Sequence, residues 1–159
     1  MRYNELTFQG RNAVLEAFRS GKTIDKLFIL DGCQDGPIKS IVREAKKTDA
    51  IINYVDKERL DRLAGTGHHQ GVVAIGAAYE YAEVEDILAA AKEKGEDPFI
   101  FILDEIEDPH NLGAIIRTAN LAGAHGVIIP KRRAVGLTAT VAKTSAGAIN
   151  YTPVAKVTN

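Results

Sequence analysis

The first half of the chain alternates between two hydrophobic patterns. Segments whose apolar residues recur every three or four positions are separated by short runs that are apolar almost throughout. The first pattern is typical of amphipathic helices and the second of buried strands. Together they predict helices over residues 10–20, 38–47 and 57–64 and strands over residues 26–30, 51–55 and 72–75. This alternation indicates a compact α/β layer structure.

The second half repeats the alternation after an acidic stretch. Here we expect strands over residues 99–103, 126–130 and 151–157 and helices over residues 111–122 and 138–145. The first of these strands contains no polar residue, which is typical of a strand buried on both faces of a parallel sheet. In the helix that follows it, one apolar stripe is expected to face the sheet, formed by Leu112, Ile115, Ile116, Ala119 and Ala122.

The two halves are predicted to be separate domains joined by an acidic connector, which contains a helix over residues 84–94. We therefore divide the chain into a first domain at 1–76, a linker helix at 77–97 and a second domain at 98–159. No helix follows the last predicted strand. The second domain is accordingly expected to be incomplete within these 159 residues.

The formal net charge of −1 conceals a segregation of charges along the chain. Residues 76–109 are strongly acidic, whereas residues 110–159 hold six basic residues and no acidic one. An uncompensated basic segment attracts polyanions, but a segment that is mostly core would show few charges of either sign as well. The single cysteine, the lack of a signal peptide and the short apolar runs predict a soluble cytoplasmic protein without a membrane span.

Residues 103–119 are the sharpest candidate for chemistry. They leave the carboxyl end of a predicted parallel strand and enter the next helix, which is where open α/β sheets bind ligands. We expect Asn111 to be the N-cap of this helix. Arg117 lies off the apolar stripe with Gly113 one turn before it, which would leave its guanidinium open to a phosphate or a ribose. An N-cap asparagine and a solvated arginine would have the same spacing, so both interpretations stay open.

Other motifs give weaker signals. The glycine-rich segment 65–71 runs into a strand rather than a helix, so it is no dinucleotide-binding loop. Residues 20–23 end like a phosphate-binding loop, but Glu16 occupies the position of its first glycine. His68 and His69 are adjacent and do not face one metal ion together, so we expect no metal site and an RNA-facing or turn role instead.

Four segments carry a resemblance to a known family. Residues 108–119 read DPHNLGAIIRTA, residues 10–17 GRNAVLEA, residues 69–74 HQGVVA and residues 144–148 TSAGA. The first resembles the first signature motif of the SpoU/TrmH-type RNA ribose 2′-O-methyltransferases. The next two are similar to the start and the end of that family's substrate-binding domain, and the last matches the helix after the motif. Within the family, the chain most resembles the enzymes that methylate a guanosine ribose in large-subunit ribosomal RNA.

The resemblance implies a small α/β/α RNA-binding domain followed by the N-terminal part of a SPOUT parallel-sheet domain, with the trefoil knot missing. It also implies an enzyme that uses S-adenosylmethionine to methylate a ribose 2′-hydroxyl of ribosomal RNA, works as a homodimer and needs no metal.

The family's second motif, a glycine-rich loop with a glutamate, and its third, Ser-Leu-Asn, do not occur in this sequence. These motifs form most of the family's cofactor pocket. The cofactor-binding residues are therefore expected to lie mostly beyond Asn159, and we name none within the chain. We accordingly expect the chain to be incomplete, inactive alone and unable to hold S-adenosylmethionine.

The resemblance also places two residues in an active site, Asn111 and Arg117. The RNA-binding residues that we expect are Arg11, Asn12, His69, Gln70, Lys131, Arg132 and Arg133. The last three follow a predicted strand end on the same edge as Asn111, although such a basic run is often only a solvated loop. An alternative function is RNA binding without catalysis. A further alternative, a doubly wound nucleotide-binding protein, lacks the phosphate loop that it would need.

Overall fold

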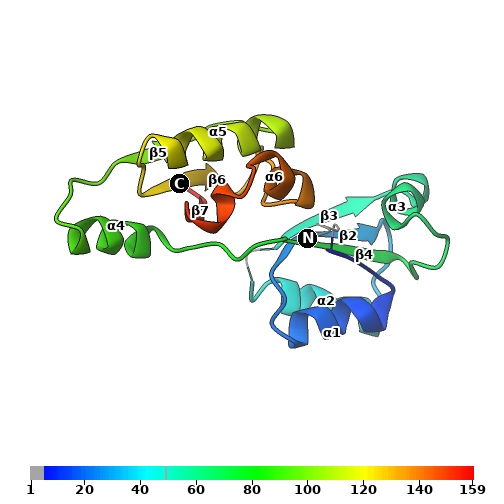
Figure 1. Ribbon diagram of the computed structural model, residues 1–159. Coiled ribbons are helices and arrows are strands. Elements are labelled where there is room, and N and C mark those ends of the chain that lie inside the picture. Colours follow the sequence, from blue (N-terminus) through cyan, green and yellow to red (C-terminus); the bar gives the residue numbers. More distant parts are fainter. Residues whose placement is uncertain (1–5, 49) are drawn as a thin grey trace. The chain divides into compact units, whose positions relative to one another are not determined.

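The computed structural model describes residues 6–48 and 50–159 and divides the chain into two compact units. The first unit ends at Ala77 and the second begins at Ala78 (Figure 1). Each unit has its own sheet and its own hydrophobic core, and the predicted α/β fold class is confirmed. Across the described residues, no helix is both long enough and apolar enough to cross a membrane.

A four-stranded sheet forms the centre of the first unit, in the order β1-β4-β2-β3. Its strands are β1 (Leu6–Gln9), β2 (Ile24–Leu30), β3 (Ile51–Val55) and β4 (Val72–Gly76). β2 and β3 run parallel, whereas β4 runs antiparallel to both of its neighbours, β1 and β2. The sequence does not predict β1, which is short, partly exposed and at the edge of the sheet.

Helices cover both faces of this sheet. α1 (Arg11–Arg19) and α2 (Gly36–Ala45) lie on one face and α3 (Lys57–Ala64) on the other (Figure 1). Side chains alternate between the two faces along β2. Leu27 and Ile29 therefore pack with α1 and α2, whereas Phe28, which lies between them, packs with Leu60 of α3. The result is a three-layered α/β/α unit.

The second unit contains a three-stranded parallel sheet in the order β5-β6-β7. Its strands are β5 (Ile100–Ile102), β6 (Gly126–Pro130) and β7 (Val154–Val157). One face is covered by α5 (Pro109–Leu121), α6 (Ala139–Thr144) and the 3₁₀ helix η1 (Ala148–Asn150). On the other face lies α4 (Val84–Glu93), whose Ile87 packs against Ile128 and Ala155. The acidic helix that we expected to act as a connector is thus packed against this sheet.

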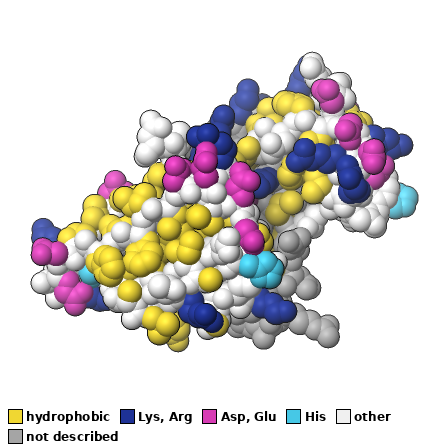
Figure 2. Space-filling view, turned by 90° about the horizontal axis from the view of Figure 1, so that it is seen from above, with side chains coloured by type: hydrophobic (Ala, Val, Ile, Leu, Met, Phe, Trp, Pro, Cys, Tyr) yellow, Lys and Arg dark blue, Asp and Glu magenta, His cyan; other side chains and the backbone are white. Residues whose placement is uncertain are grey.

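The burial of β5 differs from the prediction. Phe99 and Ile102 are 47% and 76% exposed, so the expectation of a strand buried on both faces is wrong. β5 is an edge strand that pairs on one side only, with β6. An apolar run reports a tendency to be buried but does not identify the partner that buries it. Figure 2 shows hydrophobic side chains gathered on the visible face of the second unit.

α5 begins earlier than predicted. Asp108, not Asn111, is the N-cap, because its carboxylate accepts a hydrogen bond of 2.7 Å from the backbone N–H of His110. Pro109 takes the first helical position, where a backbone N–H would have no partner within the helix. Asn111 is therefore the third residue of the helix. The predicted stripe divides into three fully buried residues, Leu112, Ile116 and Ala119, the half-buried Ile115 and the exposed Ala122.

Candidate functional site

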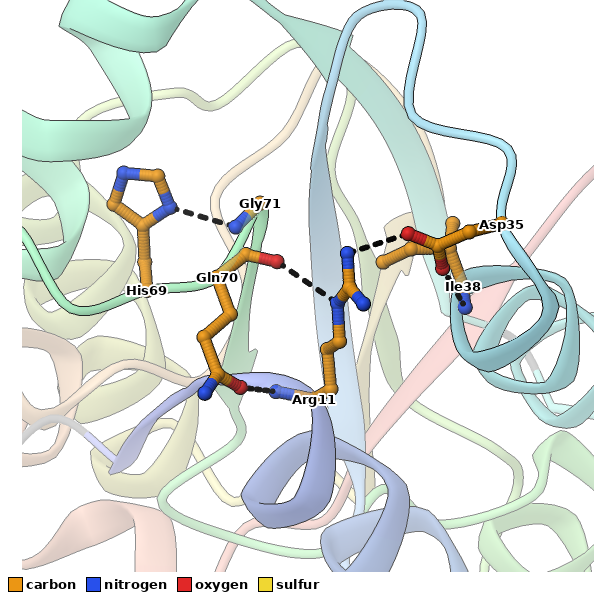
Figure 3. Close-up of polar contacts among 6 residues, drawn as sticks. All are labelled: Arg11, Asp35, Ile38, His69, Gln70 and Gly71. Carbon is orange, nitrogen blue, oxygen red and sulfur yellow. Dashed lines mark hydrogen bonds and ion pairs between the residues drawn. The ribbon is translucent and has the colours of Figure 1, made fainter.

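The loops at one end of the first sheet meet at Arg11 (Figure 3). The backbone N–H of Arg11 donates to Oε1 of Gln70 over 3.0 Å, and its Nε donates to the Gln70 carbonyl over 3.2 Å. A terminal guanidinium nitrogen forms an ion pair with Asp35. We call Arg11, Asp35, His69 and Gln70 the Arg11 cluster. The structure thus brings together two predicted RNA-binding residues, Arg11 and Gln70, that lie 59 positions apart in the chain.

Asp35 links this cluster to α2. One of its oxygens accepts from Arg11, and the other caps α2 by accepting from the backbone N–H of Ile38 over 3.2 Å. The Arg11 guanidinium therefore ties together the start of α1, the loop before β4 and the start of α2. Because Nε and one terminal nitrogen are engaged within the chain, the orientation of this cation is fixed before any ligand arrives.

His69 holds the loop rather than facing solvent. Its side chain is buried, and its Nδ1 accepts a hydrogen bond of 2.9 Å from the backbone N–H of Gly71. The ring proton must then sit on Nε2, which donates to the Asp61 carboxylate over 2.8 Å. Both ring nitrogens are occupied within the unit. We therefore reassign His69 from contacting RNA to positioning its neighbour Gln70.

The backbone around Gln70 adopts an unusual conformation. Gln70 has a φ of +51°, which non-glycine residues rarely adopt, and Gly10 opposite it has a φ of +88°. A Cβ added to Gly10 would lie 3.3 Å from Oε1 of Gln70, so glycine allows the two loops to approach. Strain of this kind clusters at functional sites. Asn12, the second residue of α1, is exposed beside this cluster.

A second group of polar residues lies at the carboxyl edge of the second sheet. β5 and β6 run parallel, so the loops that follow them leave the sheet at the same edge. Glu105 in the first loop and Arg133 in the second form an ion pair of 3.0 Å. Their φ angles are +53° and +54°, so both backbones are strained. Arg132 beside them is exposed, and Lys131 is half-buried.

The two predicted catalytic residues lie on α5, which follows the loop at this edge of the sheet. Asn111 and Arg117 are both exposed. Six helical residues separate them by about 9 Å along the axis and about 120° around it. Arg117 forms no ion pair or hydrogen bond with any residue that the structure describes. Its charge is therefore available to a ligand.

Gly113 has a different role from the one predicted for it. It is buried, and a Cβ at this position would lie 1.8 Å from Oγ1 and 2.9 Å from the backbone carbonyl carbon of Thr144. The glycine lets α5 pack closely against α6 and does not create space around Arg117. The Thr144 hydroxyl is held by the backbone carbonyls of Thr140 at 2.9 Å and Pro109 at 3.3 Å. This contact fixes the start of α5.

The residues that hold the cofactor are the part of the site that the sequence does not name. None of the described residues is assigned to the cofactor.

Sequence reasoning missed two positioning residues, Asp35 and Asp61. Asp35 precedes Gly36 and Pro37 at the start of a helix, which is a local N-cap signal. Its pairing with Arg11, 24 positions away, has no such signal. The contact of Asp61 with His69 depends on where α3 ends relative to the next loop, and no local motif reports it.

Two family descriptions match this chain in succession. Residues 9–82 match "RNA 2′-O ribose methyltransferase substrate binding", and residues 98–159 match the "SpoU rRNA Methylase family". The chain belongs to the SpoU/TrmH family of RNA methyltransferases. The Arg11 cluster lies in the first match, and Asn111 and Arg117 lie in the second.

Curated relatives in this family are similar over most of the chain. YacO of Bacillus subtilis, named for the TrmH family of tRNA/rRNA methyltransferases, is 55% identical over 150 residues, which are 94% of this chain and 60% of the relative. A similarly named protein of Staphylococcus haemolyticus is 48% identical over 155 residues, which are 98% of this chain and 62% of the relative. The chain thus spans about 60% of the length of these SpoU/TrmH relatives.

Solved structures with a similar arrangement carry related names. An AdoMet-bound rRNA methyltransferase of Sinorhizobium meliloti has a TM-score of 0.42 and 24% identity, covering 94% of this chain and 54% of that one. The SpoU methyltransferase AviRb of Streptomyces viridochromogenes, in complex with AdoMet, has a TM-score of 0.44 and 20% identity, covering 98% of this chain and 56% of that one.

Proposed function

We propose that the protein transfers a methyl group from S-adenosylmethionine to a ribose 2′-hydroxyl of RNA, with a guanosine of ribosomal RNA as its substrate. The observation that carries the proposal is the exposed Arg117 on α5, which has no partner among the residues that the structure describes and lies within a segment that matches the SpoU methylase family. The relatives named for tRNA and rRNA methylation support an RNA substrate. We further propose a homodimer that acts in the cytoplasm, as the resemblance and the cysteine usage suggest.

The two halves of the chain would divide this work. Residues 1–76 are proposed to bind RNA, with Arg11, Asn12 and Gln70 as contacts and His69 as their support. Residues 98–159 are proposed to form part of the methyltransferase domain. In that domain, the basic run of Lys131, Arg132 and Arg133 follows β6 at the carboxyl edge of the sheet, which is also the edge where the chain leads into α5. There the run would bind the phosphates near the target ribose.

Methylation of a hydroxyl releases its proton, for which solvent water is the acceptor, and it needs the oxygen aligned with the methyl carbon and its developing negative charge stabilised. Arg117 is suited to the second task, because a guanidinium stays protonated and does not act as a base. Its forked donors would bind the adjacent phosphate or the forming alkoxide. Asn111, about 1.7 turns earlier on the same helix, would orient the ribose through its carboxamide.

The methyl donor itself would supply an electrophilic sulfonium methyl group. At the carboxyl edge of the second sheet, the described residues offer an exposed apolar side chain, Ile102, and an ion pair between Glu105 and Arg133. These groups are not a complete set of partners for S-adenosylmethionine. Among the residues that the structure describes, no group of three or more His, Cys, Asp or Glu side chains is placed to hold a metal ion.

The test is methyl transfer to ribosomal RNA by the whole protein, measured with tritiated S-adenosylmethionine. Arg117→Ala is expected to lower turnover about 10²- to 10³-fold while leaving RNA affinity nearly unchanged. Arg19→Ala is the control, since Arg19 is also an exposed arginine and lies at the end of α1, away from both candidate sites. Equal losses of turnover and affinity in Arg117→Ala would contradict the catalytic role. The absence of any transfer to RNA by the wild type would favour the alternative, an RNA-binding module without catalysis.

A further inference from the structure

A groove runs along α2 in the first unit, outside the Arg11 cluster. Its volume is about 420 Å³. Lys39, Arg43 and Lys46 line it along α2 and its C-cap, Tyr54 lines it from β3, and Cys33 lines it from the loop before α2. We call this feature the α2 groove. Its size lies within the range of sites that hold a nucleoside or a similar small molecule.

The cations of the α2 groove form one stripe along the helix. Lys39, Arg43 and Lys46 follow one another at intervals of four and three positions, so they share a helix face and span about 10 Å. None of them forms an ion pair with another residue in the described part of the chain. Like charges at this spacing destabilise a helix. A ligand of negative charge would remove that cost.

The two carboxylates on α2 and its N-cap, Glu44 and Asp35, are each bonded to a cation outside this stripe, although Glu44 also lies in the field of Arg43. Glu44 pairs with Lys47 over 2.9 Å on another side of α2. Asp35, at the start of the helix, accepts from Arg11 and caps α2. The groove therefore keeps its positive charge and begins close to the Arg11 cluster: Sγ of Cys33 would lie 3.2 Å from a Cβ added to Gly71.

The remaining walls of the α2 groove suit a flat, apolar surface. Tyr54 is a large aromatic residue on the edge strand β3, and 56% of its surface is exposed. Ile38, which is buried, and the half-buried Val42 supply apolar atoms between the cations. An aromatic face beside a row of cations is the combination that binds single-stranded nucleic acid, because bases stack on the ring while phosphates pair with the cations.

We propose that the α2 groove binds unpaired nucleotides of the RNA substrate, with a base stacked on Tyr54 and phosphates paired with Lys39, Arg43 and Lys46. The proposal rests on the proposed function, since it extends the RNA contact from the Arg11 cluster along α2. It specifies a single-stranded segment, because a base inside a duplex has no free face to offer Tyr54. An acidic peptide would satisfy the cations but would leave the aromatic wall unused.

Cys33 provides a direct test in the unmodified chain, because it is the only cysteine in the sequence and lines the groove. The rate of its alkylation by iodoacetamide is measured with saturating single-stranded oligouridine, with a duplex RNA of equal length, and with polyglutamate. Single-stranded RNA is expected to slow the reaction at least severalfold, and the other two polyanions to have little effect. Equal protection by polyglutamate, or no protection by bound single-stranded RNA, would overturn the proposal.

Variants separate stacking from charge. Tyr54→Ala is expected to weaken oligouridine binding roughly 5- to 150-fold, the loss of about one stacked base, and Tyr54→Phe to retain most of the affinity. Replacing both Lys39 and Arg43 by Gln is expected to reduce the slope of log affinity against log salt by about 1.4. Lys57→Gln, on α3 and away from the groove, is a single-charge control and should leave the slope unchanged. An unchanged affinity in Tyr54→Ala would refute the stacking role.

The failure of this proposal is distinguishable from that of the proposed function. If the groove variants bind RNA like the wild type while Arg117→Ala still loses methyl transfer, the groove assignment alone is wrong. If the wild-type protein binds no RNA, both the groove assignment and the proposed function are wrong.

Discussion

The arginines of the two candidate sites differ in how far the protein itself holds their side chains. In the first unit, Arg11 is bound on two sides, to Gln70 and to Asp35, and its direction is set by the protein itself. In the second unit, Arg117 is exposed and unpaired among the described residues. A side chain that is held in advance loses little further freedom on binding, which suits recognition. A side chain that forms its strongest bonds only in the reacting complex suits catalysis.

The contacts that support these two sites also differ in kind. Beneath Gln70, the support is a buried hydrogen-bond network through His69. Beneath the start of α5, the support is steric, because Gly113 lets Thr144 approach to a distance that no side chain would allow. The first kind of support fixes a loop and its polar groups. The second fixes a helix and leaves its exposed face free.

The largest effect on stability is expected for Gly113→Ala. The new Cβ would collide with both the side chain and the backbone of Thr144, so α5 and α6 must move apart. We expect a loss of about 2–3 kcal/mol in the free energy of unfolding, despite a gain of nearly 1 kcal/mol in helix propensity. Denaturant titration followed by circular dichroism measures it.

Gly36→Ala is the matched control for this prediction. Gly36 is also in the first turns of a helix, its φ is not positive, and no atom lies within 4 Å of a Cβ added there. The substitution should leave stability unchanged or raise it slightly. Equal effects of the two alanines would show that the α5–α6 contact is not the support that we describe.

The next effect in size is expected for His69→Ala. The substitution leaves the Gly71 N–H without its acceptor and removes the bond to Asp61, which should cost about 1–2 kcal/mol of unfolding free energy. Because Gln70 is then less well held, affinity for RNA should fall as well. His68→Ala, at the exposed neighbouring position, should change both by little. A His69→Ala variant with unaltered RNA affinity would show that the Arg11 cluster does not need a preformed loop.

Much of the fold follows from local sequence, and particular elements show why. The strands at 51–55 and 126–130 and the helix at 57–64 match the structure residue for residue. Asp56 separates the first strand from the helix and caps the helix, so one local signal fixes both boundaries. β1 escapes prediction because its alternation of apolar and polar residues runs over only four positions, all of them at least partly exposed. β5 was predicted as buried because its composition is apolar, whereas its exposure depends on the strand having one neighbour only.

The candidate sites are less predictable from sequence, because their geometry is non-local. The motif around Asn111 and Arg117 was visible as residues, and the family assignment it suggested is confirmed by both family matches. The reason for Gly113 was not visible, since Thr144 lies 31 positions later in the chain. The Arg11–Gln70 contact likewise joins distant loops. The roles predicted for these residues stay predictions until the variants are measured.

The smallest expected effect concerns the C-terminal end of α2, where Lys47, two residues past the helix, pairs with Glu44. The hydrogen bond from Lys47 lowers the pKa of Glu44 below its usual value. A lowered pKa means that the pair stabilises the fold above the ordinary pKa of a glutamate and that this contribution disappears as the pH falls through the lowered value. Lys47→Met should therefore raise the pKa of Glu44, which carboxyl NMR titration measures, with little change in stability because the pair is exposed. Lys57→Met should leave it unchanged. An unchanged Glu44 pKa in Lys47→Met would indicate that Glu44 interacts mainly with Arg43 instead. Arg43 would then be partly neutralised, and the α2 groove would carry less positive charge than we propose.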